Sequence, residues 1–224
     1  MVIIAGVQLA WADIIVDQQP DLGGGPASDM DFIDQFGRRF WQREADNILL
    51  SQDADLRSLK WWGFYGGDGT PATPPPTSES IQIRFMIARA SDGLPDENAV
   101  LFDETYLNPS RTPTGRILAA VGGRPAEQVY QVEFEGAIHL WASTLYWLEI
   151  VQLDDVNSMF RMETGSGVLA GHAFMNPLTN GWFGSESSFA FELSDVPEPG
   201  TGALLSLGIL TLGKCRGRRE DERK

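Results

Sequence analysis

The feature that most constrains the fold of this chain is a set of short segments in which apolar side chains recur at every second position. In the stretch 80–88, SIQIRFMIA, each odd-numbered residue from Ile81 to Ile87 is large and apolar. Successive side chains of a β-strand point to opposite faces, so a period of two predicts a strand with one buried face. A helix would need a period near 3.6. The alternation therefore favours a fold built from sheets.

Seven further apolar-rich runs have the length of strands. They span residues 45–50, 56–62, 100–106, 116–121, 128–134, 145–153 and 189–193. The 24 glycines and 13 prolines of the chain supply turns between such strands. We therefore predict an all-β fold, a jelly-roll-like β-sandwich that occupies residues 13–195 as one domain. The only helical candidates are residues 30–37 and a short hydrophobic helix near the C-terminus.

Residues 1–12 have the layout of a secretory signal peptide. An apolar run over residues 2–9 is followed by Ala10, Trp11 and Ala12. The small residues Ala10 and Ala12 match the cleavage site of such a signal, which predicts a mature chain that starts at Asp13. A positively charged start is missing from this segment, so an ordinary buried first strand is the alternative.

Residues 196–224 form a second segment with the character of a signal, in three ordered parts. Pro197, Glu198 and Pro199 come first, an apolar run over 200–213 follows, and a basic cluster comes last. The basic cluster comprises Lys214, Arg216, Arg218 and Arg219. As a helix the apolar run would be about 21 Å long, against ~30 Å for a hydrocarbon core, and snorkelling basic side chains can compensate for the difference. The alternative is a buried core helix of the main domain.

This three-part order resembles the PEP-CTERM sorting signal of Gram-negative bacteria. The resemblance implies that an exosortase, a membrane protease-transpeptidase, processes the chain near Pro197, Glu198 and Pro199. It also implies that the apolar run anchors the chain transiently in the inner membrane, with the basic cluster as its stop. Proteins with this signal are typically exported and associated with exopolysaccharide or the biofilm matrix. The motifs WGFY, IQIRF and YWLEIV are similar to those of domains found upstream of such signals.

The distribution of charge excludes one class of partner. The chain has a net charge of −14, and six of its 17 basic residues follow Gly213, so the part before the tail is strongly acidic. An acidic body repels phosphate backbones, which excludes nucleic-acid binding. The single cysteine, Cys215, lies in the tail, so no intramolecular disulfide holds the fold.

No catalytic motif occurs in the sequence, and we expect a protein that is not an enzyme. His139 and His172 lack the spacing of a zinc site, and no cysteine in the body can serve as a nucleophile. Glu133, Glu135 and Glu149 leave a polysaccharide-active enzyme as a less favoured alternative. An exposed strand face would explain the same carboxylates.

Calcium is the one cofactor for which the sequence offers ligands. Asp92, Asp96, Glu97 and Asn98 cluster in the stretch SDGLPDEN, and Ca²⁺ prefers oxygen ligands of these types. The spacing differs from that of an EF-hand loop, and Asp and Gly are common in ordinary turns. We therefore expect a turn, with a structural calcium ion as the alternative.

The aromatic residues carry the remaining functional signal. Alternation places Trp62 and Trp147 on the more polar faces of their predicted strands, where flat rings can stack on sugars. The alternative is that both tryptophans fill packed positions. Together these features predict an exported, non-catalytic structural or adhesive protein of the cell surface or biofilm matrix. A carbohydrate-binding module that recognises exopolysaccharide is the alternative.

Overall fold

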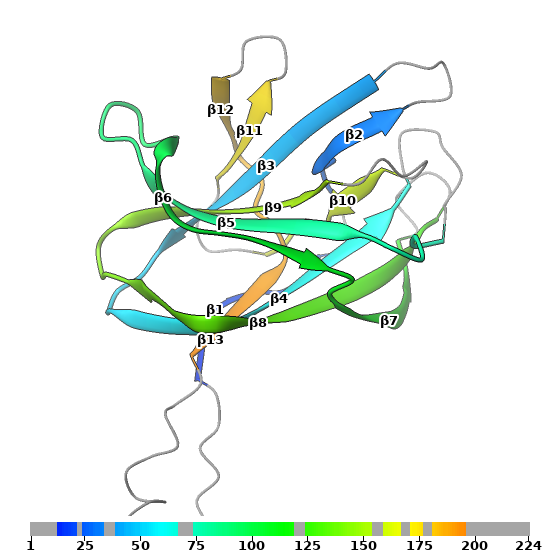
Figure 1. Ribbon diagram of the computed structural model, residues 1–224, viewed down its shortest axis with the longest axis horizontal. Helices are drawn as coiled ribbons and strands as arrows, with labels where there is room; N and C mark the ends of the chain where they lie inside the picture. The colour runs from blue at the N-terminus through cyan, green and yellow to red at the C-terminus, as the bar shows by residue number, and fades with distance from the viewer. Residues whose placement is uncertain are drawn as a thin grey trace, which may run out of the picture.

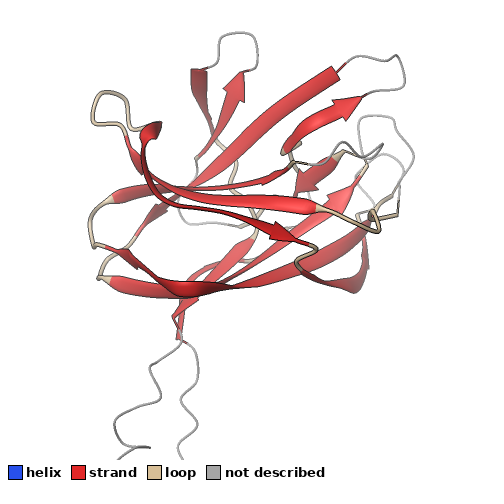
Figure 2. Cartoon of the chain, viewed as in Figure 1, coloured by secondary structure: helices blue, strands red, loops and turns tan. Residues whose placement is uncertain are grey.

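The computed structural model describes residues 13–21, 24–33, 39–66, 74–118, 124–153, 159–166, 171–176 and 181–195. Every helix or strand within these ranges is a β-strand, and the strands form two facing sheets (Figures 1 and 2). The strands are β1 (Asp13–Gln18), β2 (Asp29–Ile33), β3 (Arg39–Leu49), β4 (Ala54–Tyr65), β5 (Ser80–Ala88), β6 (Pro95–Leu107), β7 (Ser110–Ile117), β8 (Ala126–Leu140), β9 (Leu145–Gln152), β10 (Phe160–Met162), β11 (His172–Asn176), β12 (Gly181–Ser185) and β13 (Phe191–Asp195). The prediction of an all-β sandwich is confirmed.

The first sheet has six strands in the order β1-β13-β4-β8-β7, with β10 also paired to β4. All of its strand pairs are antiparallel. The long strands β4 and β8 form its centre and pair from Ala54–Leu140 to Gly63–Gln128. β13 pairs with β4 over residues 58–61, whereas β10 pairs with β4 over residues 63–65. The last strand of the body therefore lies inside this sheet, between β4 and β1.

The second sheet has seven strands in the order β12-β11-β3-β2-β9-β5-β6. β3 and β9 pair directly with each other over Ala45–Leu49 and Leu145–Glu149. β2 lies between them at the other end of β3, where Asp29 pairs in parallel with Gln152 of β9. The other pairs of this sheet are antiparallel.

One of the places where the chain passes from the second sheet to the first is the turn between β6 and β7. Asn108 has a positive φ of 50°, which asparagine tolerates better than most residues. Its backbone N–H donates to the Glu79 carbonyl (2.8 Å), and its side-chain oxygen accepts from the Glu79 N–H (3.0 Å). The buried carboxylate of Glu79 in turn accepts from Arg111 on β7 (2.6 Å). These bonds fix the corner between the two sheets.

The core lies between the two sheets and is rich in aromatic rings. Trp61 of β4 stacks on Tyr130 of β8, with ring centroids 5.1 Å apart and planes at 8°. Phe85 of β5 meets Phe134 of β8 edge to face across the sandwich, at 5.9 Å and 85°. Such pairs add to the free energy that burial of the rings contributes. Alternation along each strand thus produces the buried face that the sequence predicted.

Two helix predictions have different outcomes. Residues 29–33 form strand β2, so the predicted helix over 30–37 is wrong in its described part. The spacing of apolar residues there fits a helix, but pairing with β3 and β9 decides the local structure. The predicted C-terminal helix lies outside the described residues. Within the part of the chain that the structure describes, no helix is long and apolar enough to cross a membrane.

Candidate functional site

The two ends of the folded body lie side by side. Asp13 is the first residue of β1 and Asp195 is the last residue of β13, and the two are direct partners in the antiparallel pair. Figure 1 shows β1 and β13 next to each other at the edge of the first sheet. We call this place, around Asp13 and Asp195, the chain-end site. The predicted signal-peptide cleavage at Ala10 and Ala12 lies outside the described residues and stays a prediction.

The chain-end site is acidic. Partial burial raises the pKa of Asp195, and the neighbouring carboxylates of Asp55 and Asp13 act in the same direction. Arg57 opposes this rise. The segment that follows Asp195 therefore starts in a negative local field.

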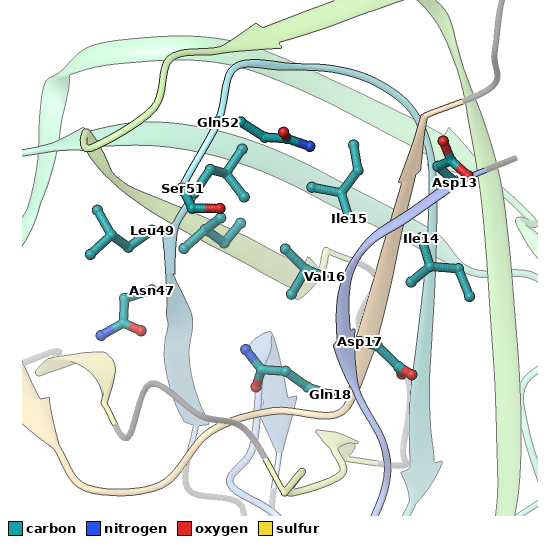
Figure 3. Close-up of a pocket in the computed structure, with 12 residues that line it drawn as sticks. Asp13, Ile14, Ile15, Val16, Asp17, Gln18, Asn47, Leu49, Ser51 and Gln52 are labelled. Carbon is teal, nitrogen blue, oxygen red and sulfur yellow. The ribbon is translucent and has the colours of Figure 1, made fainter.

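A groove of about 580 Å³ lies beside β1, between β1 and the end of β3. Residues 13–18 and 47–52 line it. Figure 3 shows Ile15, Val16 and Gln18 directed from β1 toward β3 and the segment after it. Ile15 and Val16 also pack on the core, and half of the lining residues are polar, so the groove is an opening of mixed character at the edge of the sandwich. Its lining holds no nucleophile with an adjacent base, so its chemistry is that of a contact surface.

Trp62 and Trp147 do lie outside the main core, on the outer faces of their sheets, but both are covered. Trp62 is 7% exposed, with the Lys60 ammonium 5.2 Å from the centre of its ring. Trp147 is 4% exposed, and its Nε1–H donates to the Gly93 carbonyl (2.9 Å). Neither ring offers a free face to a sugar. The structure therefore describes both residues as filling packed positions, and their exposure does not support glycan binding.

A closed ionic network, which we call the outer ion cluster, lies beside Trp147 on the outer face of the second sheet. Fully buried Glu149 accepts from Arg43 Nε (2.5 Å) and Nη2 (3.0 Å), and also from Arg84 Nε. Glu97 pairs with both arginines, at 3.0 Å and 3.2 Å, and accepts from Trp182 Nε1 (2.9 Å). Burial raises the pKa of Glu149, and Arg84 opposes the rise. All of these groups have partners, so the cluster serves packing.

The three glutamates that allowed a polysaccharide-active enzyme as an alternative do not lie together in the structure. Glu133 and Glu135 are exposed on β8 of the first sheet. Glu149 lies in the outer ion cluster of the second sheet. A glycosidase needs two carboxyl groups on either side of one bond. These three residues do not form such a pair.

A serine–histidine–glutamate group, which the sequence did not indicate, lies at the end of β11. Ser187 Oγ is 2.6 Å from His172 Nδ1, and His172 Nε2 is 3.3 Å from Glu44 Oε2. These residue types can form a catalytic triad when the histidine accepts the proton of the serine. The three residues come from distant parts of the chain, so no spacing could have revealed them.

The hydrogen bonds of His172 oppose a catalytic role for this group. His172 Nδ1 also lies 3.0 Å from the Ser187 carbonyl, which can only accept. Nδ1 therefore carries the proton and cannot take one from Ser187 Oγ. The neutral ring then presents Nε2 as an acceptor to the carboxyl group of Glu44. This arrangement joins β11 to β3 and to the segment before β13.

The ionisation of this pair follows from its burial. Burial raises the pKa of Glu44 from its ordinary value of 4.5 to about 8, with Gln42 and Arg161 acting against the rise. Burial lowers the pKa of His172, and its backbone bond to Ser187 opposes this. At neutral pH a protonated Glu44 therefore lies beside a neutral His172.

Replacing Glu44 with glutamine should flatten the pH dependence of stability. Folded wild type keeps a proton on Glu44 that the unfolded chain loses above about pH 4.5, so its stability falls as the pH rises toward about 8. Glu44→Gln has no such proton. As the pH rises through this window, its free energy of unfolding should therefore increase relative to that of the wild type, by up to about 1.4 kcal/mol per pH unit. Urea denaturation of both proteins across the window measures the gap, and parallel pH profiles would contradict the assignment.

Of the four residues considered for calcium, only Asp92 lies in the expected turn, between β5 and β6, whereas Asp96, Glu97 and Asn98 lie on strand β6. Asp92 pairs with Arg89 (3.0 Å) and accepts from the Leu94 N–H (3.1 Å). Asp96 accepts from the N–H of Asn98 (2.9 Å), and Glu97 belongs to the outer ion cluster. Among the residues described in the structure, no group of three or more His, Cys, Asp or Glu is placed to hold a metal ion.

The fold and the chain-end site define a class of protein: a β-sandwich domain whose last described strand ends at Asp195, directly before the C-terminal segment of the chain. Residues 195–219 match the family model of the PEP-CTERM protein-sorting motif. The chain therefore carries a PEP-CTERM protein-sorting motif directly after its last described strand. No curated protein matches the chain in sequence. The match contains Pro197, Glu198 and Pro199, the apolar run and the predicted basic cluster, all beyond the described residues.

The motif has two direct implications. It is the recognition signal for an exosortase, which supports that enzyme as a partner of this chain. It also implies an exported protein that is processed at the membrane. Together with the β-rich fold, it suggests a surface protein without enzymatic activity.

Proposed function

We propose that this protein is a structural or adhesive module of the cell surface or the biofilm matrix, delivered by cleavage of its sorting signal. An exosortase would cut near Pro197, Glu198 and Pro199, and the sandwich would then leave the inner membrane. The apolar run 200–213 and the basic cluster would serve as a transient anchor that the mature protein lacks. The surface or matrix destination and the adhesive role are parts of this proposal.

The position of the motif relative to the fold carries the proposal. The match begins at Asp195, which is also the last residue of β13. Residues 196–199 then separate the fold from the apolar run, and four extended residues span at most about 14 Å. β13 is held between β1 and β4. Cleavage after this strand would remove the anchor and leave every described strand in place.

Three contacts support a non-catalytic body. The proton on His172 Nδ1 is bound to a backbone carbonyl, which removes the base that Ser187 would need. Glu149 is enclosed by two guanidinium groups. The groove beside β1 has a mixed polar and apolar lining without a nucleophile–base pair. These features suit a module that acts through its surface.

Mass spectrometry of the extracellular protein tests this function. The secreted form should lack the residues after about Pro199, because the exosortase removes the apolar run and the basic cluster before release. The intact mass of the protein from the medium should therefore be lower than that of the membrane-bound precursor from the same cells. A mature extracellular protein that still ends at Lys224 would contradict the proposal.

A further inference from the structure

One tryptophan differs from the others in the described structure. Trp141 is 51% exposed, whereas the other tryptophans with described side chains, Trp61, Trp62, Trp147 and Trp182, are all buried. Trp141 directly follows Leu140, the last residue of β8. About half of this large ring stays in water, which the packing of the fold alone does not explain.

The backbone around Trp141 is held in place. The Trp141 N–H donates to the hydroxyl of buried Tyr146 (3.0 Å), and the Ala142 N–H donates to Asp53 Oδ1 (2.7 Å). The Ser143 N–H donates to the Leu50 carbonyl (2.9 Å). The turn after β8 is therefore tied to the segment between β3 and β4. A backbone fixed in this way loses little conformational entropy when a ligand binds.

Hydrogen-bonding groups lie directly beside the exposed ring. His139 is two residues earlier on β8, and its ring lies 5.0 Å from that of Trp141 at 79°. His139 Nδ1 is 2.7 Å from Asp55 Oδ1, and these two residues are direct partners between β4 and β8. Both side chains are exposed. The free groups of this pair can donate to and accept from the hydroxyls of a ligand.

We propose that Trp141, His139 and Asp55, here called the Trp141 site, bind a sugar ring of a polysaccharide. The apolar face of a pyranose would stack on the indole, and its hydroxyls would bond to His139 and Asp55. Asp55 places a carboxylate in the site, and Asp53 binds the backbone N–H of the residue after Trp141, so the surroundings are acidic. The site therefore favours a neutral sugar over a uronic acid. This inference rests on the proposed function and gives the matrix protein a specific ligand class.

Affinity electrophoresis of the full-length protein tests the Trp141 site. Native gels would contain hydroxyethylcellulose, galactomannan or alginate, the last as the uronic-acid polymer. We expect at least one neutral polymer to retard the wild type and alginate to have no effect. Trp141→Ala should weaken the retardation about tenfold, because it removes the stacking surface. Asp55→Asn should weaken it less.

Leu107→Ala is the matched control, since Leu107 is 73% exposed and lies on β6 of the other sheet. Leu107→Ala should leave the retardation unchanged. Urea denaturation should show that all three variants are folded. The inference would be overturned if neither neutral polymer retards the wild type, or if the wild type and Trp141→Ala are retarded equally. It would also be overturned if Trp141→Ala lost binding to phosphatidylcholine–phosphatidylglycerol vesicles and nothing else. Processing, measured by mass spectrometry, does not involve Trp141, so it tests the proposed function separately.

Discussion

Replacement of Pro197, Glu198 and Pro199 by alanine is expected to keep the protein in the inner membrane with its C-terminal segment attached. Proline has no backbone N–H and favours an extended residue before it, so the two prolines oppose continuation of a helix or of a central strand through the native segment. Alanine has the highest helix propensity, and three alanines allow the apolar run to extend toward Asp195. The processing enzyme would then meet a folded segment without its recognition residues. We expect nearly complete loss of release.

Cell fractionation with immunoblotting measures this effect as the ratio of membrane-bound to extracellular protein. A matched control replaces Thr201, Ser206 and Thr211 with alanine, which changes three residues of the same segment and keeps the apolar run apolar. This control should be released like the wild type. Normal release of the variant without the proline–glutamate–proline residues would refute the assigned role of these residues.

The architecture was predictable where local pattern and tertiary structure agree. The alternation in 80–88 predicted a strand with the bounds of β5, and the run 145–153 differs from β9 by one residue. Strand β2 was missed because its apolar spacing also fits a helix, and long-range pairing with β9 overrides that local signal. The pairing of β1 with β13 joins the two ends of the body. No local pattern specifies a register between strands so far apart in the sequence.

The same distinction applies to the sites. The sorting motif is a continuous segment, so its residues could be read in order from the sequence, and the family match covers them. Trp62 and Trp147 are on the outer faces that alternation predicted, but the covering side chains come from other parts of the chain. Trp141 stands just beyond a strand, where alternation gives no information on exposure. Ser187, His172 and Glu44 meet only through folding.

Replacement of Glu149 by methionine is expected to destabilise the sandwich by about 3–5 kcal/mol. Glu149 is fully buried and accepts hydrogen bonds from both Arg43 and Arg84. Without it, the two guanidinium groups share only Glu97, which is partly exposed. Two neighbouring positive charges then repel each other in a site with little water, and this repulsion adds to the lost hydrogen bonds.

The double variant Arg84→Met/Glu149→Met should recover part of this loss, because Arg43 then keeps Glu97 and no second buried cation remains. Glu192→Gln, which breaks the partly exposed pair with Lys60 on the other sheet, is the control and should cost less than about 1 kcal/mol. Urea denaturation of the four proteins gives the free energies of unfolding. An equal loss for Glu149→Met and Glu192→Gln would show that the outer ion cluster contributes no more than a surface ion pair, and its buried geometry would then have no energetic consequence.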